Sequence, residues 1–343
     1  MAELHDAEIA LSALQNKLST TIAEFVGEAV EISQLQQLTA GAAAQTWRFQ
    51  ASYGGQSQTL ILRSGIDADQ FAGALKKADE AIVINAAVAV GVIAPRILGI
   101  LQPGHGLGEG FVMECIDGES LPPKILRDPT LSAAREKLAA QCGEALAQIH
   151  AVPRSELSHL PVQDAKAQLD FYQQSYQRFG MPLPVFDAAF QYLSQHQFEA
   201  ELTLVHGDFR NGNILVDENG LSGVLDWELS HIGDPMEDLG WLCVNSWRFG
   251  QRDKPVGGFG TREQLFSAYE QASGLKVDPA RVNYWELFGV LKWGVLCLYQ
   301  CEVHLSGAQR SVERAAIGRR VSECELDIIA LLEQASQHQG EPQ

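Results

Sequence analysis

From residue 204 to residue 228 the chain reads LVHGDFRNGNILVDENGLSGVLDWE, and this stretch decides the fold. Two short apolar runs, Ile214–Val216 and Gly223–Leu225, lie on either side of Asp217-Glu218-Asn219-Gly220. An Asn-Gly pair between two such runs is a strong signal for a β-hairpin. The stretch therefore predicts two short antiparallel strands that are joined by a tight turn.

The predicted hairpin brings three polar residues together. Asn213 precedes its first strand and Asp226 follows its second, so antiparallel pairing places these two residues side by side. An amide oxygen and a carboxylate at one end of a hairpin form a hard oxygen site that suits Mg²⁺, which also binds phosphate oxygens. Asp208 lies five residues upstream of Asn213, where it would face whatever the metal holds. Each residue alone could serve only turn chemistry, but their combination and spacing indicate a catalytic site.

The composition is typical of an ordinary soluble globular protein. The chain has 343 residues, 46% of them hydrophobic and 20% charged, which suffices for two lobes with substantial cores. Its formal net charge of -18 argues against binding to nucleic acids or to anionic membranes. The acidic N-terminal residues lack the features of a signal peptide, the longest apolar run is too short for a bilayer span, and the cysteines show no disulfide spacing. These features favour a cytoplasmic protein.

The same stretch resembles the catalytic and metal-binding loops of kinase-fold enzymes. His206-Gly207-Asp208, four intervening residues and then Asn213 resemble a small-molecule kinase catalytic loop, and Leu225-Asp226-Trp227-Glu228 stands where protein kinases have Asp-Phe-Gly. With the continuation from Ile232 to Trp241, the pattern resembles the aminoglycoside phosphotransferase family. It is most similar to the branch that is fused to, or encoded beside, acyl-CoA dehydrogenases.

This resemblance implies both the fold and the reaction. The implied fold is α+β and two-lobed, like that of protein kinases, with a nucleotide-binding lobe over residues 1–113 and a mainly helical catalytic and substrate-binding lobe over residues 114–343. Apolar periodicity predicts helices, which cover residues 6–26 (appended to the first lobe), 131–150 and 282–305. The implied reaction is a Mg²⁺-dependent transfer of phosphate from ATP to a hydroxyl group of a small molecule.

Short apolar runs predict the strands of the first lobe, which cover residues 32–38, 46–52, 59–63 and 111–115. Residues 39–45, which include Gly41, resemble the loop that covers the nucleotide, although a plain hairpin turn is the alternative. The last strand runs into Met113-Glu114-Cys115-Ile116, which resembles the hinge between the lobes. The resemblance implies that backbone groups of Glu114 and Ile116 bind adenine and that Met113 lines the adenine pocket.

Arg63, at the end of the third predicted strand, is the expected phosphate-binding residue. The resemblance implies that Arg63 stands where protein kinases have Lys and that it pairs with Glu80, on a helix through residues 72–87. A guanidinium can hold phosphate oxygens in a bidentate manner. The alternative is that Glu80 and its charged neighbours form only a solvated helix face, which would comprise Lys76, Lys77 and Asp79 as well.

The resemblance also assigns roles in the transfer. Asp208 would orient the acceptor hydroxyl and take its proton, while Asn213 and Asp226 would hold Mg²⁺ against the nucleotide phosphates. Arg210 would contact the transferred phosphate or pair with a carboxylate, and Glu228 would ligate the metal or support the site. Residues that are expected to have bracing or structural roles are His206, Asp234 and Asp238.

The acceptor is the part of the reaction that the sequence determines least. Basic residues gather between Arg248 and Arg262 and between Arg310 and Arg320, which favours an anionic small molecule such as a hydroxyacyl-CoA or a hydroxy acid. Salt-bridged helix faces would produce the same pattern. A helical insertion over residues 164–200, rich in aromatic residues, would line the substrate cleft or only pack.

Two other hypotheses remain. One is an aminoglycoside or macrolide antibiotic as the acceptor. The other is a nucleotide-binding pseudokinase that acts as a scaffold, against which the presence of Asp208, Asn213 and Asp226 together counts. The sequence leaves the oligomeric state and the choice between ATP and GTP open.

Overall fold

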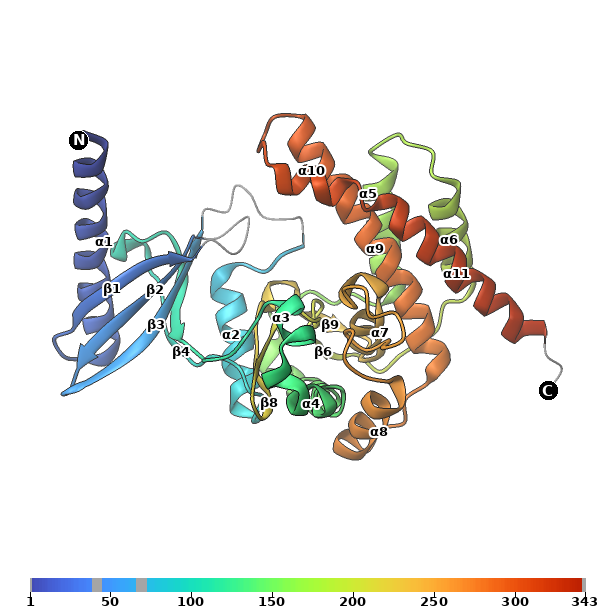
Figure 1. Ribbon diagram of the computed structural model, residues 1–343, viewed down its shortest axis with the longest axis horizontal. Coiled ribbons are helices and arrows are strands. Elements are labelled where there is room, and N and C mark those ends of the chain that lie inside the picture. Colours follow the sequence, from blue (N-terminus) through green and yellow to red (C-terminus); the bar gives the residue numbers. More distant parts are fainter. Residues whose placement is uncertain (1, 39–44, 66–72, 341–343) are drawn as a thin grey trace.

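The computed structural model describes residues 2–38, 45–65 and 73–340, and these residues form two lobes (Figure 1). A sheet with two helices makes up the first lobe, and helices dominate the second. Within the described residues, no helix is both long enough and apolar enough to cross a bilayer.

The first lobe is an antiparallel sheet whose strands follow the order β1-β2-β3-β5-β4. Its strands are β1 (Glu31–Leu38), β2 (Gln45–Tyr53), β3 (Gln56–Gly65), β4 (Ile97–Ile100) and β5 (Glu109–Glu114). Its helices are α1 (Ala2–Val26) and α2 (Lys77–Ala89). The four strands and both helices that the sequence predicts for this lobe are present, but α2 begins at Lys77, because residues 73–76 of the predicted helix over residues 72–87 are not helical.

The alternation of side chains along the strands decides what each face of the sheet carries. Leu60 and Leu62 of β3 are buried in a small core with Leu18 and Ile22 of α1. Successive side chains of a strand point to opposite faces. Arg63 therefore projects from the other face, which is the side of α2.

The other face of the sheet is continuous with the core of the second lobe. Phe111 of β5 and Ile84 of α2 belong to one large hydrophobic cluster that also contains Leu146 and Phe288 of the second lobe. Val112, the neighbour of Phe111, belongs instead to the small core with α1. The sheet thus separates two cores, and α2 packs with the larger one.

The second lobe consists of helices and two small pairs of strands. Its helices are α3 (Pro122–Arg127), α4 (Ser132–His150), α5 (Ala165–Gln177), α6 (Pro184–Gln195), α7 (Met236–Cys243), α8 (Arg262–Ser273), α9 (Pro279–Leu305), α10 (Val312–Gly318) and α11 (Val321–Gly340). The strands β6 (Thr203–Val205) and β9 (His231–Gly233) pair with each other, and β7 (Ile214–Asp217) pairs with β8 (Gly220–Val224). The predicted helices over residues 131–150 and 282–305 are α4 and most of α9, and the insertion contains α5 and α6.

The predicted hairpin is the β7–β8 pair. Its second strand begins at Gly220, three residues earlier than the apolar run at Gly223–Leu225 indicates, because Gly220 already pairs with Asp217. Gly220 has φ +123°, a backbone angle that is open to glycine. The two-residue loop of Glu218 and Asn219 then closes the hairpin.

Helices α4 and α8 approach closely at Gly143. A Cβ atom at this position would lie 2.5 Å from the carbonyl oxygen of Leu265 and 2.9 Å from the amide nitrogen of Tyr269. We expect Gly143→Ala to lower the free energy of unfolding by about 1–3 kcal/mol, because backbone atoms of α8 must move away. Urea denaturation measures this change, with the exposed Glu144→Ala as a control that should shift stability by less than about 0.5 kcal/mol. An unchanged free energy of unfolding in Gly143→Ala would show that α4 and α8 can move apart without loss of stability.

Candidate active site

The β7–β8 hairpin places the two predicted metal ligands side by side. Ile214 pairs with Val224, and the N–H of Leu225 donates to the carbonyl oxygen of Asn213 over 2.8 Å. Asp226 comes next, in a left-handed conformation with φ 67° and ψ 63° that Asp adopts more readily than most residues. The chain then turns through η5 (Trp227–Leu229), so the Asp226 side chain lies at the same end of the hairpin as Asn213.

Three donors fix the carboxylate of Asp208. Its Oδ1 atom accepts hydrogen bonds from Trp241 Nε1 at 2.8 Å and from Arg210 Nε at 3.0 Å. Its Oδ2 atom accepts a hydrogen bond from Asn213 Nδ2 at 2.5 Å. The predicted catalytic carboxylate is therefore held in one orientation next to the predicted metal ligands, and Arg210 pairs with it.

The side chains of Asn213 and Asp226 fit Mg²⁺. The amide nitrogen of Asn213 is committed to Asp208, which leaves its amide oxygen available to a metal. Asp226 uses its Oδ1 atom to bind Arg63, which leaves Oδ2. An amide oxygen and a carboxylate oxygen are hard donors of the kind that Mg²⁺ binds together with waters and phosphate oxygens.

Arg63 connects both lobes to this site. Its Nη1 atom lies 3.1 Å from Glu80 Oε1, and its Nη2 atom lies 2.5 Å from Asp226 Oδ1. The expected pair between Arg63 and Glu80 is therefore present. Burial by itself would raise the pKa of Asp226, but the charge and the hydrogen bond of Arg63 outweigh burial and lower it.

Lys77 and Glu228 complete the ion-pair network. Lys77 Nζ lies 2.7 Å from Glu80 Oε2 and 3.0 Å from Glu228 Oε2. Because Lys77 is only 3% exposed and Glu80 is 0% exposed, the alternative of a solvated helix face is wrong for these two residues. Burial and the nearby Asp226 raise the pKa of Glu228. With all side chains ionised, three carboxylates face two cations in this network, an excess of negative charge that suits a bound metal ion.

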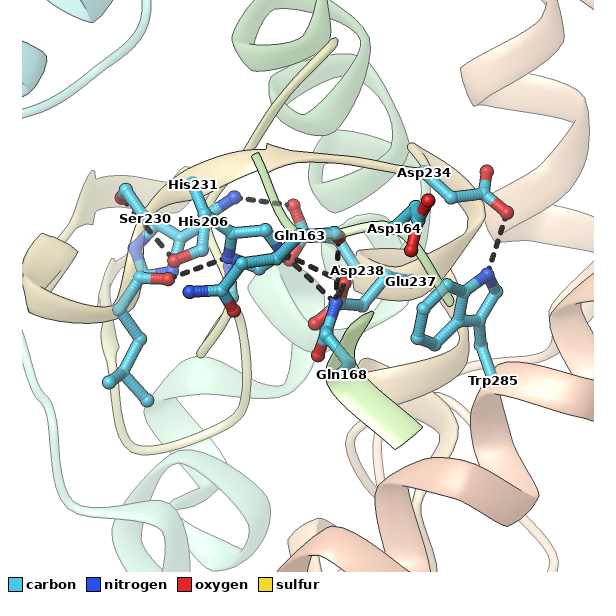
Figure 2. A network of polar contacts seen from close by, with 12 residues as sticks. Gln163, Asp164, Gln168, His206, Ser230, His231, Asp234, Glu237, Asp238 and Trp285 are labelled. Atoms are coloured by element: carbon cyan, nitrogen blue, oxygen red, sulfur yellow. Dashed lines mark hydrogen bonds and ion pairs between the residues drawn. The ribbon is translucent and has the colours of Figure 1, made fainter. Parts of the chain in front are cut away.

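Asp238 of α7 braces the predicted catalytic loop at His206 and Gly207, and Figure 2 shows Asp238 and His206 in one network of polar contacts. Its two oxygens accept hydrogen bonds from the backbone N–H groups of His206 at 2.8 Å and Gly207 at 2.9 Å. The ring of His150 lies 3.1 Å from Asp238 Oδ2. Burial would raise the pKa of Asp238, but the hydrogen bond and charge of His150 lower it. The structural role that the sequence suggests for Asp238 thus includes holding the catalytic loop.

His206 joins the predicted catalytic loop, residues 206–213, to the predicted metal-binding segment at Asp226. Its Nε2 atom lies 3.1 Å from the carbonyl oxygen of Leu225, and its Nδ1 atom accepts a hydrogen bond from the Asp208 N–H at 3.2 Å. Burial lowers the pKa of His206, which keeps the ring neutral at physiological pH. These contacts agree with the bracing role that is expected from the sequence.

The structure places the other predicted nucleotide-binding residues at the end of β5. Met113 is half-buried and pairs with Ile61 and Ile97 in the sheet. The N–H of Glu114 donates to the carbonyl oxygen of Arg96 at 2.9 Å, so only its carbonyl remains for adenine. Among the described residues, no backbone hydrogen bond uses the N–H of Ile116. Gly41 lies outside the described residues, and its role stays a prediction.

Some arginines of the two basic stretches have structural roles. Glu286 of α9 is buried and pairs with Arg248 at 2.8 Å and with Arg262. Arg314 is also buried and binds the side chains of Gln300 and Gln309. Arg248 and Arg262 supply the cationic partners that a buried carboxylate needs, and Arg314 is occupied by two glutamine side chains. These three arginines are therefore no argument for an anionic acceptor.

A cavity of about 230 Å³ lies beside the catalytic loop. Helix α5 of the insertion, the last residue of η5, strand β9 and helix α9 all contribute to its lining. The described residues that line it are Gly73, Gln163, Ala167, Gln168, Phe171, Tyr172, Leu229, His231 and Lys292. Lys292 Nζ donates to the carbonyl oxygen of Gly207 at 3.1 Å, which places the cavity next to Asp208. The aromatic insertion therefore does line a cavity at the site.

Comparison with known proteins agrees with this geometry. The family model of the phosphotransferase enzyme family matches residues 34–275. Human acyl-CoA dehydrogenase family member 11 is 26% identical over 295 residues, which are 79% of this chain and 36% of that protein. The chain spans only 16% to 38% of the length of the curated relatives that it matches.

Solved structures show the same fold. A crystal structure of a Ralstonia eutropha JMP134 protein, named after the aminoglycoside phosphotransferases, superposes with a TM-score of 0.74 at 21% identity and covers 93% of this chain and 98% of that one. A thermostable mutant of aminoglycoside phosphotransferase APH(4)-Ia, in complex with ADP and hygromycin B, gives a TM-score of 0.58 at 15% identity and covers 92% and 98% of the two chains. The predicted two-lobed, kinase-like fold is confirmed.

Proposed function

Because the chain belongs to the phosphotransferase enzyme family, we propose that it transfers the terminal phosphoryl group of ATP to a hydroxyl group of a small molecule, with Mg²⁺ as the metal. The arrangement of Asp208, Asn213 and Asp226 at one end of the hairpin is the observation that carries this proposal. The complex of APH(4)-Ia with ADP supports an adenine nucleotide as the donor.

Each side chain of the site has a defined task in this transfer. Asp208, oriented by Trp241 and Asn213, accepts the proton of the acceptor hydroxyl. Asn213 and Asp226 would hold Mg²⁺, which when bound neutralises charge on the phosphates of the donor. Arg63, positioned by Glu80, binds the phosphates of the donor.

The proposed acceptor is a hydroxy acid or a hydroxyacyl-CoA. The similarity to acyl-CoA dehydrogenase family members 10 and 11 supports an acceptor with an acyl group. The volume of the cavity beside Asp208, about 230 Å³, is below the range of about 300–1,000 Å³ that is usual for pockets of drug-sized ligands. This size favours a small acceptor over an antibiotic with several sugar rings.

Phosphate transfer from radiolabelled Mg-ATP to a panel of acceptors tests the proposal. The panel contains free hydroxy acids, hydroxyacyl-CoAs, aminoglycosides and macrolides, and each reaction is repeated with EDTA. We expect label on a hydroxy acid or hydroxyacyl-CoA only, and none when EDTA is present. Label on an antibiotic alone would overturn the acceptor assignment, and tight binding of ATP without transfer to any acceptor would favour a scaffold.

A further inference from the structure

The cavity beside the catalytic loop contains a buried cation that the proposed transfer does not use. Lys292 of α9 is 4% exposed and lines the cavity. Its Nζ atom donates to the carbonyl oxygen of Gly207 at 3.1 Å and lies 3.7 Å from Glu237 Oε1. Burial opposes the charge of Lys292, but neighbours that include Tyr172 and Glu237 raise its pKa, so that the ammonium stays charged.

A second cation faces the same carboxylate (Figure 2). His231 Nε2 lies 3.0 Å from Glu237 Oε2, and His231 Nδ1 lies 2.9 Å from the carbonyl oxygen of Leu229. Both ring nitrogens thus face oxygen acceptors, which favours the doubly protonated ring, and the amide nitrogen of Gln168 lies 3.2 Å from the same Nε2 atom. Burial would lower the pKa of His231, but Glu237 raises it.

Among the residues that the structure describes, the wall of the cavity therefore carries one positive charge in excess. Lys292 and His231 contribute two cations, and Glu237 contributes the one carboxylate that contacts both. The remaining polar groups on the described wall are the amides of Gln163 and Gln168 and the hydroxyl of Tyr172, which are neutral. An excess buried charge is unfavourable unless it is paired, and an anionic group of a ligand would pair it.

The other side of the cavity suits a short carbon chain. Phe171, Tyr172 and Leu229 provide apolar surface there. A buried cavity of about 150 Å³ holds benzene, with its six non-hydrogen atoms, so about 230 Å³ holds about nine. A hydroxy acid of four to six carbons has about seven to nine non-hydrogen atoms, which is the number that a cavity of this volume holds. Coenzyme A is many times larger.

We propose that this cavity binds the carboxylate of a free, short-chain hydroxy acid, with Lys292 as the charged donor to that carboxylate. This inference rests on the proposed function and chooses between its two acceptor classes. The contact of Lys292 with Gly207 places the bound carboxylate close to Asp208, which receives the hydroxyl end of the same short molecule.

Binding measured without turnover tests the inference. Calorimetric titrations use the full chain with Mg²⁺ and AMP-PNP, and the ligands are 3- and 4-hydroxy acids of four to six carbons, their neutral primary amides and their CoA thioesters. We expect the acids to bind at least ten times more tightly than the amides. Equal affinity of acid and amide would overturn the role of Lys292.

Two variants locate the site, and a third is the control. Lys292→Met removes the cation, and Ala167→Phe fills the cavity from an exposed position of α5 without touching a charge. Each should raise the Kd of the acid at least ten-fold. Gln174→Phe adds the same ring to an exposed position two turns further along α5, outside the cavity lining, and should leave the Kd unchanged. An unchanged Kd in Ala167→Phe would place the acid elsewhere.

The acceptor panel separates failure of this inference from failure of the proposed function. Phosphorylation of a CoA thioester, without binding of the free acid, would retain the phosphotransferase and overturn the carboxylate site. Binding of the acid that depends on Lys292 and Ala167, without transfer to any acceptor, would retain the carboxylate site and overturn the transfer.

Discussion

Asp208→Ala is expected to lower kcat by about 10²–10⁴-fold, the contribution that is usual for a positioned general acid or base. The effect should fall on kcat rather than on the KM for ATP, because the donor is held by Arg63 and by the metal-binding side chains. Steady-state kinetics with the acceptor found in the panel measures both constants. Glu218→Ala, in the exposed turn of the same hairpin, is the matched control and should retain full activity.

The loss of three hydrogen bonds at Asp208 requires a second measurement. Its carboxylate accepts bonds from Arg210, Asn213 and Trp241, so alanine leaves three donors without that partner. Thermal unfolding of the variant separates misfolding from loss of chemistry. A folded Asp208→Ala protein that keeps more than half of its activity would remove Asp208 from the reaction.

Asp238→Ala is expected to lower the free energy of unfolding by about 3–5 kcal/mol, because it leaves three buried polar groups without their charged hydrogen-bond partner. The partners that lose their acceptor are His150 and the backbone of His206 and Gly207. Urea denaturation at pH 7 measures the loss. The exposed Asp253→Ala, a carboxylate in the loop after α7, should change stability by less than about 0.5 kcal/mol.

The same variant has an expected dependence on pH. The pKa of Asp238 is lowered in the folded protein, so its stabilisation is complete above the unfolded value of about 3.9 and is lost as the pH falls through the folded-state value. The difference in stability between the native protein and Asp238→Ala should therefore be constant near neutral pH and shrink below about pH 4. A difference that grows on acidification would contradict the assignment of an ionised Asp238.

The parts of the site that the sequence predicts are local in the chain. Asn213 and Asp226 are separated by one hairpin, and the turn signal between them fixes their pairing. Arg63 and Glu80 are far from this hairpin, and their place in the site follows only from the family resemblance. Strand alternation then explains why Arg63 faces α2 rather than the core with α1.

The residues that the sequence does not reveal are those that act across long separations. Trp241 donates a hydrogen bond to Asp208, which is 33 residues away in the sequence. The contact of Lys77 with Glu228 joins residues 151 positions apart, and that of Lys292 with Gly207 joins residues 85 positions apart. Lys292 lies within an apolar helix pattern. Such a pattern does not distinguish a lysine of the site from an ordinary lysine whose aliphatic chain is buried. The basic stretches also mislead in part, because tertiary packing pairs Arg248 and Arg262 with Glu286, a residue of another helix.

The division of the first lobe between two cores has a consequence for its dynamics. Because α1 packs in the small core and α2 packs in the large one, we expect the first lobe to open as two units rather than one. Native-state opening of such a chain proceeds in contiguous blocks, and here α1 with the outer strands forms one block while α2 stays protected with the other. Amide protons of β1 and β2 then exchange with solvent through an opening that leaves α2 intact. The ion pair between Arg63 and Glu80 crosses the boundary between these blocks, so bound nucleotide at Arg63 would slow exchange in the sheet.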